Sequence, residues 1–269
     1  MLQRNYYFLV ASLHDLILDE SKLLYNKNEF KDELHSHLHK DDFQLIELLY
    51  LPNDNKNLLN ILLKNNRPFI DGGKYPLEYL EEQIKEPDTV IDYLKNFIIN
   101  FRNETLDYQN LNIEDKLTSS YYDFVIKSEN KFIAEWFKFD LILKNFIIGL
   151  NCRKFNIPVN NYLISSNEIT EKISKSTARD FSLSSELPFA DFVIHHFETD
   201  DSLEFEKNIS TLIWQKLDEM TFFNYFSVEK IFAYVVKIDL VERWLKLEPV
   251  NGKELFIRFI QDLEKSKEL

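Results

Sequence analysis

Glycine and proline are scarce in this chain: among 269 residues there are only 4 glycines and 7 prolines. Tight hairpins and nucleotide-binding α/β sheets need turns with positive φ, which glycine supplies, so this scarcity disfavours both classes. Aromatic residues are abundant instead, with 23 Phe and 13 Tyr, and 45% of the chain is hydrophobic. That is enough apolar side chain for one large core or several contiguous bundles. We therefore predict an all-α protein.

Positive charge and cysteine are also in short supply. The formal net charge is −13, which disfavours nucleic-acid binding because the neutralisation of phosphates requires a basic face. The single cysteine, Cys152, cannot form an internal disulfide, and this suits the reducing cytosol. The neighbouring Arg153 and Lys154 would lower the pKa of a reactive thiol, but a packed thiol is the simpler interpretation.

Long apolar runs without charge are missing too. The most apolar window is 132–150, and it carries four charged side chains: Glu135, Lys138, Asp140 and Lys144. A lipid-spanning helix does not normally tolerate so many charges. The first residues show no cleavage-type motif of a signal peptide. We expect a cytoplasmic protein that does not span the membrane.

Apolar residues recur with helical spacing along most of the chain. We predict helices over about residues 6–16, 21–39, 42–51, 57–64, 77–87, 89–102, 132–150, 202–218, 231–245 and 253–265. Pro52 should end the third of these helices, and Ser227 can cap the helix over 231–245. Ser165-x-x-Glu168 is typical of a capping box that opens one more short helix. Residues 65–76 and 176–188 are predicted connections.

Three histidines alternate near one predicted helix end: His35, His37 and His39. On a helix His35 and His39 share a face, a spacing that suits metal ligands. No other cluster in the sequence completes a coordination sphere, so we interpret the three as a solvated helix end and predict no metal and no cofactor. A helical hydrolase that uses them is the least favoured alternative. Gly72-Gly73-Lys74 lacks the rest of a phosphate loop and is interpreted as a turn.

One helical segment occurs twice, as residues 138–145 and again as residues 237–244. Each copy has an aspartate on an apolar stretch and a cation four residues later: Asp140 with Lys144, and Asp239 with Arg243. Two carboxylates can work as an acid–base pair when they lie close together. A cation one turn away makes a structural pair the simpler interpretation. We predict no catalytic residue, and an assembly of similar helical bundles.

Several stretches carry a resemblance to a known family. They are residues 5–13 and 21–24, residues 139–145 with 153–154, and residues 229–237, 242–244, 252 and 256–258. In these stretches the chain resembles the C subunit of the prokaryotic V/A-type ATPases, which corresponds to the d subunit of the eukaryotic V-type enzyme. Residues 214–264 look like a divergent bacterial version that is encoded beside V-type ATPase genes. The chain departs from the family at Ser12, where a basic residue is typical, and at Asn145, one position off the usual spacing.

The resemblance implies a non-catalytic central-stalk subunit, or rotor socket, of a V/A-type rotary ATPase. Such a protein links the central stalk subunits to the membrane proteolipid rotor ring, and it transmits torque in ATP-driven or ATP-synthesising ion transport. The resemblance also implies three similar helical bundles in a funnel-like, pseudo-threefold arrangement, here a single unit with sub-bundles at about 1–110, 111–200 and 201–269. It further implies a location peripheral to the membrane, with no small-molecule substrate. The alternative is a helical adaptor or scaffold protein of another complex.

Overall fold

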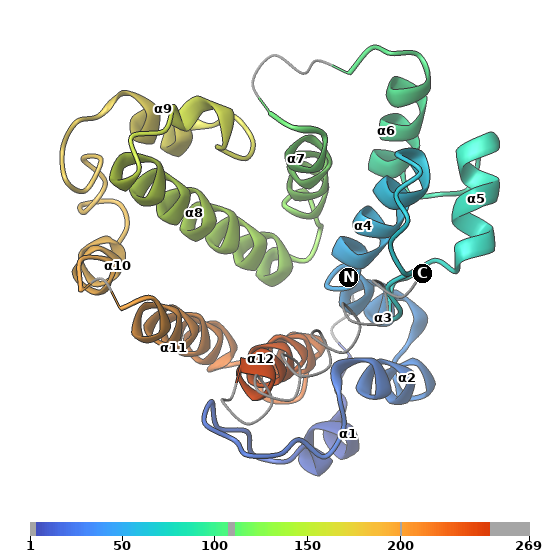
Figure 1. The fold of residues 1–269 in the computed structure, drawn as a ribbon. Coiled ribbons are helices and arrows are strands. Elements are labelled where there is room, and N and C mark those ends of the chain that lie inside the picture. Colours follow the sequence, from blue (N-terminus) through green and yellow to red (C-terminus); the bar gives the residue numbers. More distant parts are fainter. Residues whose placement is uncertain (1–3, 107–110, 200, 248–269) are drawn as a thin grey trace, which may run out of the picture. The chain divides into compact units, whose positions relative to one another are not determined.

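The computed structural model describes residues 4–106, 111–199 and 201–247, and these residues form helices and no β-strand, which confirms the all-α class (Figure 1). The α-helices are α1 (Tyr7–Ser12), α2 (Lys27–His37), α3 (Lys40–Glu47), α4 (Leu51–Leu62), α5 (Leu77–Lys85), α6 (Asp92–Arg102), α7 (Ile113–Val125), α8 (Lys131–Lys154), α9 (Glu168–Lys175), α10 (Ala190–Phe197), α11 (Ser202–Thr221) and α12 (Val228–Leu247). A short 3-10 helix, η1 (Val159–Asn161), follows α8. The helix predicted over 253–265 lies outside the described residues.

The described residues divide into two compact units. The first unit is residues 44–212 and holds α4 to α10. The second unit is formed by residues 4–43 and 213–247, with α1, α2 and α12. The chain passes from one unit to the other within α3 and again within α11. The sub-bundles at about 1–110, 111–200 and 201–269 and their funnel-like arrangement stay predictions.

Helix α8 is the centre of the first unit. It packs against α7 and against α9, α10 and η1, and Figure 1 shows it between these groups of helices. Its buried side chains cover much of its circumference, as the apolar window predicted: Phe132, Ile133, Trp136, Phe137, Leu141, Leu143, Asn145, Phe146, Leu150 and Cys152. A Cβ atom at Gly149 would lie 2.6 Å from a side-chain carbon of Ile173, so glycine permits the close approach of α9.

The long helix also fastens the segment that follows it. The amide of Asn145, which is 1% exposed, donates to the Ile164 carbonyl and accepts from the Ile164 N–H, both at 2.8 Å. Arg153 donates to the carbonyls of Ser176, Ala178 and Arg179, at 3.1, 2.7 and 3.0 Å, and its guanidinium lies over the ring of Phe181. Two side chains of α8 therefore hold the chain on both sides of α9, at Ile164 before it and at residues 176–179 after it.

In the second unit, α2 packs against α12 through aromatic rings. The ring of Phe30 lies between the rings of Tyr25 and Tyr234, with centroid distances of 5.3 Å to each. At the start of α2, the Lys27 N–H donates to the Glu242 carboxylate, and the Lys27 ammonium pairs with Asp239 at 3.0 Å. A capping box formed by Asn26 and Glu29 satisfies the first N–H groups of α2. This contact is formed by one stacked and one edge-to-face ring pair around the buried Phe30, together with ion pairs.

The structure corrects three of the predicted helix ends. Pro52 lies in the first turn of α4 and does not end a helix, because a proline at that position loses no intrahelical hydrogen bond. The capping box of α9 is formed by Asn167 and Thr170, while Ser165 has a φ of 59° and bonds to Ser119 instead. Ser227 directly precedes α12, but its buried hydroxyl makes no hydrogen bond, so it does not cap the helix through its side chain.

We expect Asn145→Ala to lower the free energy of unfolding by about 2–4 kcal/mol, because it leaves two buried backbone groups of Ile164 without partners. The matched control is Asn151→Ala on the same helix, since the Asn151 amide donates only to the Ile147 carbonyl one turn earlier. Its expected cost is below about 1 kcal/mol. Urea denaturation followed by circular dichroism measures both. Equal losses would contradict the role of Asn145.

Candidate functional site

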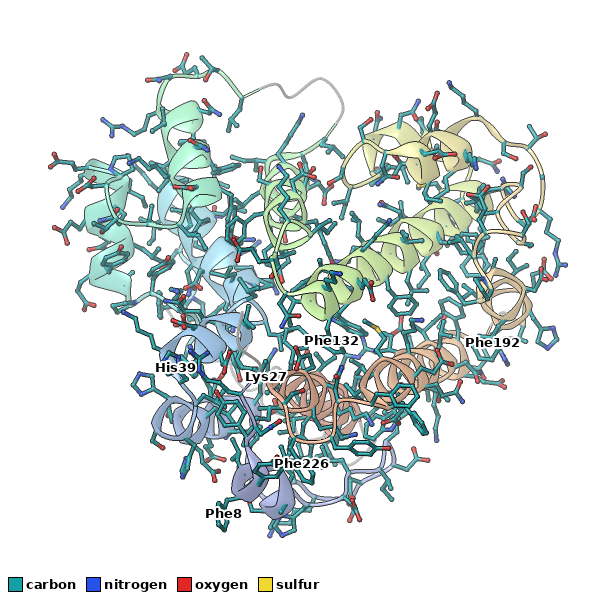
Figure 2. All side chains as sticks on the ribbon, turned by 180° about the vertical axis from the view of Figure 1, so that it is seen from behind. Phe8, Lys27, His39, Phe132, Phe192 and Phe226 are labelled. Carbon is teal, nitrogen blue, oxygen red and sulfur yellow. The ribbon has the colours of Figure 1, made fainter. Side chains whose placement is uncertain are left out.

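Six aromatic side chains in two segments of the second unit are exposed, and we call them the aromatic surface: Tyr7, Phe8, Phe222, Phe223, Tyr225 and Phe226. Two of them come from α1 and four from the turn between α11 and α12. The exposed fraction reaches 95% for Phe8 and 84% for Phe223. Figure 2 shows Phe8 pointing away from the ribbon. Clustered exposed rings of this kind mark interaction sites on proteins.

The two segments of the aromatic surface are fastened to each other. The Tyr6 N–H donates to the Phe226 carbonyl at 2.6 Å, and the rings of Tyr7 and Phe226 are 4.8 Å apart between centroids. The rings of Phe222 and Phe223 meet edge to face at 4.9 Å. Tertiary contacts thus join two segments that lie far apart in the sequence.

Helix α1 is also tied to the start of α3. The Tyr6 hydroxyl donates to the Asp42 carboxylate and accepts the His39 N–H at 3.2 Å. Arg4 pairs with Asp41 at 3.2 Å and with Asp42 at 3.4 Å. Burial, with the hydrogen bond to Asp42, raises the pKa of Tyr6 to about 12. These contacts fix the start of α1, a helix of only six residues that includes Tyr7 and Phe8.

The aromatic surface is formed by stretches without charge. Residues 5–13 and 220–228 contain no Asp, Glu, Lys or Arg, although these types make up 29% of the chain. The hydroxyls of Tyr7 and Tyr225 are among the few polar groups in these stretches. The surface therefore suits an apolar, uncharged partner better than a charged one.

The first unit has a smaller exposed apolar surface after the end of α8. It consists of Phe155, Ile157 and Tyr162, with exposed fractions of 62%, 40% and 43%, and we call it the α8-end surface. Here a cation is close by, because the Lys154 ammonium lies 6.0 Å from the centroid of the Phe155 ring. The two surfaces thus differ in their local charge.

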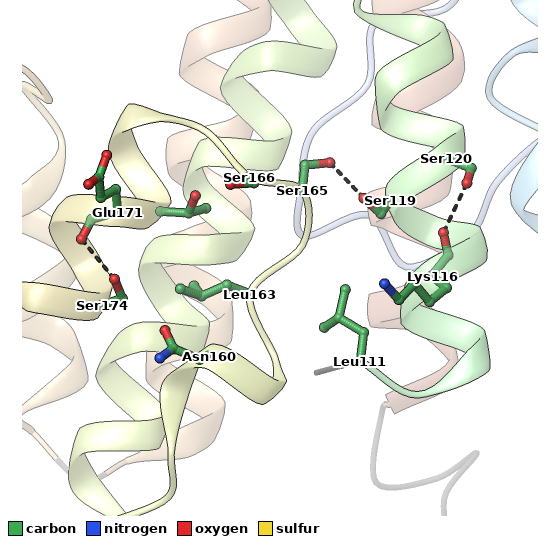
Figure 3. Close-up of a pocket in the computed structure, with 11 residues that line it drawn as sticks. Leu111, Lys116, Ser119, Ser120, Asn160, Leu163, Ser165, Ser166, Glu171 and Ser174 are labelled. Atoms are coloured by element: carbon green, nitrogen blue, oxygen red, sulfur yellow. Dashed lines mark hydrogen bonds between the residues drawn. The ribbon is translucent and has the colours of Figure 1, made fainter. Parts of the chain in front are cut away.

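A serine-lined hollow of about 750 Å³ lies between α7 and the segment from η1 to α9 (Figure 3). Its hydroxyl groups come from Ser119, Ser120, Ser165, Ser166, Thr170 and Ser174. Most of them bond to neighbours in the protein: Ser119 to Ser165 at 3.0 Å, and Ser174 to the Glu171 carbonyl at 2.8 Å, for example. Hydroxyls that are already bonded to the protein indicate no particular ligand.

The three histidines each contact a different residue. The ring of His35 packs on Phe43 at 5.0 Å, His37 bonds to the Glu33 carbonyl at 2.8 Å, and His39 lies 3.3 Å from Asp41. All three histidines are exposed. In the described part of the chain, no three His, Cys, Asp or Glu side chains are arranged so that they could hold a metal ion.

The two repeated aspartates hold different partners and lie in different units. Asp140 accepts a hydrogen bond of 2.5 Å from the Tyr122 hydroxyl, and the Lys144 ammonium lies over the same ring at 5.4 Å. Burial, together with the charge of Asp140, raises the pKa of Tyr122 well above its ordinary value. Asp239 instead pairs with Lys27 on α2. Each aspartate fastens its helix to a neighbouring one through Tyr122 or Lys27, and not, as predicted, through the cation four residues later.

Two further motifs of the sequence have structural roles. In the Gly-Gly-Lys turn, the N–H groups of Lys74 and Tyr75 donate to the buried carboxylate of Asp54 at 2.8 and 3.1 Å. A side chain at Gly73 would overlap this carboxylate. The thiol of Cys152 is buried, which raises its pKa, so the interpretation as a packed thiol is confirmed.

Sequence reasoning missed the aromatic surface. Its signal was present in residues 220–228, where four aromatic residues occur without a single charge. In an otherwise helical chain, the same composition is typical of a buried turn. Only the packing distinguishes Phe223, which is exposed, from Phe132, which is 8% exposed.

Comparison with known proteins identifies one family. A family model described as "Protein of unknown function (DUF2764)" matches residues 3–267. No curated protein matches the chain, and no solved structure does. None of the described helices has both the length and the apolar character that a membrane crossing requires.

The two aspartates give a matched pair of substitutions. We expect Asp239→Ala to cost at most about 1 kcal/mol in unfolding free energy, because its ion pair with Lys27 is exposed to solvent. Asp140→Ala should cost about 2–3 kcal/mol, because the hydroxyl of Tyr122, a residue only 3% exposed, loses a charged acceptor. Denaturant unfolding compares the two variants. A larger loss for Asp239→Ala would contradict this order.

The raised pKa of Tyr6 predicts a dependence of stability on alkaline pH. An unfolded tyrosine ionises near pH 10, whereas Tyr6 in the folded protein ionises at about 12. Its contribution to stability is therefore full below about pH 10 and is lost as the pH rises towards 12. Tyr6→Phe should cost about 1–2 kcal/mol at neutral pH, and stability should then fall less between pH 10 and 12. Tyr7→Phe, at an exposed neighbour, should retain the wild-type slope.

Proposed function

This chain belongs to the DUF2764 family, and we propose that it is a non-catalytic central-stalk subunit of a V/A-type rotary ATPase. In this role it links the stalk subunits to the membrane proteolipid rotor ring and transmits torque between them. It has no catalytic site of its own, resides in the cytoplasm and is peripheral to the membrane. The three similar bundles in a funnel-like arrangement belong to the same proposal.

The proposal rests mainly on the contacts made by three side chains of α8: Asp140, Asn145 and Arg153. The family resemblance in the centre of the chain rests on residues 139–145 and 153–154. In this stretch, Asp140 bonds to Tyr122 on α7, Asn145 holds Ile164, and Arg153 holds three carbonyls after α9. Asp140 thus joins α8 to α7, while Asn145, at the position where the chain departs from the family spacing, and Arg153 hold the segments before and after α9. Such fastenings suit a part that carries mechanical load.

Two exposed surfaces of different chemistry support a linking role. The aromatic surface belongs to the second unit and the α8-end surface to the first. A connector between two unlike partners needs two recognition surfaces, and aromatic side chains are frequent anchors at such interfaces. An enzyme would instead need a pocket in which reactive groups converge.

Affinity capture from the native membrane fraction in mild detergent tests the proposal. With the tagged full-length chain as bait, we expect mass spectrometry to recover stalk and proteolipid-ring subunits at least tenfold above an untagged control. The ATPase subunits must be detectable in the starting extract.

The opposite result is equally informative. If the ATPase subunits are present in the extract and absent from the captured material, the proposal is wrong. Reproducible capture of a different assembly would then identify the chain as an adaptor or scaffold of that complex.

A further inference from the structure

The serine-lined hollow of the first unit contains a cation that the protein itself does not neutralise. Lys116 lies on α7, and Figure 3 shows its ammonium group directed from that helix towards the segment between η1 and α9. The residue is half-buried. Within the described part of the chain, its ammonium makes no hydrogen bond and no ion pair. Asp115, its neighbour in sequence, accepts from the Asn112 amide at 2.8 Å instead.

The one acidic side chain among the described lining residues is already paired. This is Glu171, whose carboxylate contacts the Lys175 ammonium one turn further along α9. The hydrogen bond from Lys175 lowers the pKa of Glu171, so this carboxylate is ionised and its charge is offset by Lys175. Lys116 therefore presents a positive charge to the hollow, although the chain as a whole is acidic. Such a charge attracts an anion.

The bonds between hydroxyls and the protein determine what these groups can offer a ligand. Ser165 donates to the Asp123 carboxylate at 3.1 Å, so it must be the acceptor in its 3.0 Å contact with Ser119. The hydroxyls of Ser120 and Ser174 donate to backbone carbonyls at 3.1 and 2.8 Å. A hydroxyl that has donated its one proton can still accept. These serines therefore offer lone pairs, which suit the hydroxyl groups of a ligand.

Three lining side chains keep donors that the protein does not use. Lys116, Asn160 and Ser166 make no side-chain hydrogen bond within the described residues. Figure 3 shows Lys116 on one side of the hollow, and Asn160 and Ser166 on the other. A phosphate group has three terminal oxygens that accept hydrogen bonds, and lysine is a common partner for it. An ammonium, an amide and a hydroxyl around one hollow match these oxygens.

We propose that the hollow is a binding site for a small polyol that carries a phosphate group. Lys116 meets the phosphate, and the lone pairs of the serines accept from the hydroxyls of the polyol. The site goes beyond the proposed function and does not depend on it. The ligand would connect α7 with the segment that leads into α9, two elements that the bond between Ser119 and Ser165 already joins at this point.

The size and the lining of the hollow support a polyol phosphate over two other anions. Its volume of about 750 Å³ exceeds what a bare phosphate needs, and it lies in the range of pockets that hold small organic ligands. None of the described lining residues is aromatic, so a nucleobase would find no ring on which to stack. Inorganic phosphate would leave the serine lone pairs unused, and a nucleotide would leave its base unsupported.

Isothermal titration calorimetry on the full-length chain tests the proposal, with ribose 5-phosphate as the probe. Ribose supplies the hydroxyls without the charge, and inorganic phosphate supplies the charge without the polyol. Lys116→Gln removes the ammonium from the hollow. Its matched control is Lys127→Gln, because Lys127 is an exposed lysine that follows α7 and does not line the hollow. Ser166→Ala removes one exposed hydroxyl and should leave the fold intact, which circular dichroism checks for all three variants.

We expect saturable binding of ribose 5-phosphate, and binding of ribose and of inorganic phosphate that is weaker by about tenfold or more. Lys116→Gln should weaken the binding of ribose 5-phosphate by about tenfold or more, because a charge-assisted hydrogen bond is lost. Ser166→Ala should weaken it by about threefold to tenfold, the effect of a neutral hydrogen bond. Lys127→Gln should bind within about twofold of wild type, since an exposed charge away from the site is screened.

Three results would overturn the inference. The first is no binding of ribose 5-phosphate at about 10 mM, a concentration that detects even weak ligands. The second is an equal loss in Lys116→Gln and Lys127→Gln, which would indicate a general attraction of anions to the chain. The third is inorganic phosphate that binds as tightly as ribose 5-phosphate. If Lys116→Gln does not fold, unchanged affinity in Ser166→Ala overturns the inference in its place. The affinity capture described above tests the proposed function separately.

Discussion

The paired hydrogen bonds between the Asn145 amide and Ile164 are the contact on which the first unit depends most. An amide that is 1% exposed is costly in a helix core unless both its donor and its acceptor are used, and here the backbone of one residue uses both. This fixes where the chain turns after α8. The close approach of Ile173 to Gly149 and the bonds of Arg153 to the segment after α9 hold the same region against α8. One buried polar contact thereby sets the position of α9 against the longest helix.

The second unit is stabilised in another way. Its central contact is a row of rings, Tyr25, Phe30 and Tyr234, and its ion pairs lie at the rim. Ring contacts supply much apolar contact in a small unit, because each aromatic side chain buries a large area and loses few rotamers. The same abundance of rings leaves some of them outside. Phenylalanines of residues 4–43 and 213–247 therefore lie both in the core of the unit, as Phe30 and Phe232 do, and on its exposed surface, as Phe8 and Phe223 do.

Much of the helical fold could be predicted from the sequence, and the reason is local. The apolar window of α8 extends over so many turns that its burial could be predicted, and the scarcity of glycine disfavoured the competing classes. Predictions failed where a residue type occurs both at the end and at the start of helices. Pro52 was expected to end a helix, but it lies in the first turn of α4. They also failed where the partner is distant in sequence. The bond between Asn145 and Ile164 and the joining of Tyr6 to Phe226 depend on the tertiary fold, and neither spacing nor composition encodes them. The aromatic surface was missed for this reason.

The charge of the chain explains how such a surface can exist. Rings left in water normally drive self-association, but a formal net charge of −13 makes copies of the chain repel each other. The same repulsion would hinder any acidic partner that approached the acidic parts of the surface. Residues 5–13 and 220–228 carry no Asp, Glu, Lys or Arg, so these stretches themselves add no like-charge repulsion. The charged side chains, which are 29% of the chain, and the uncharged rings thus have opposite effects on association: the net charge opposes it, and the exposed rings favour it.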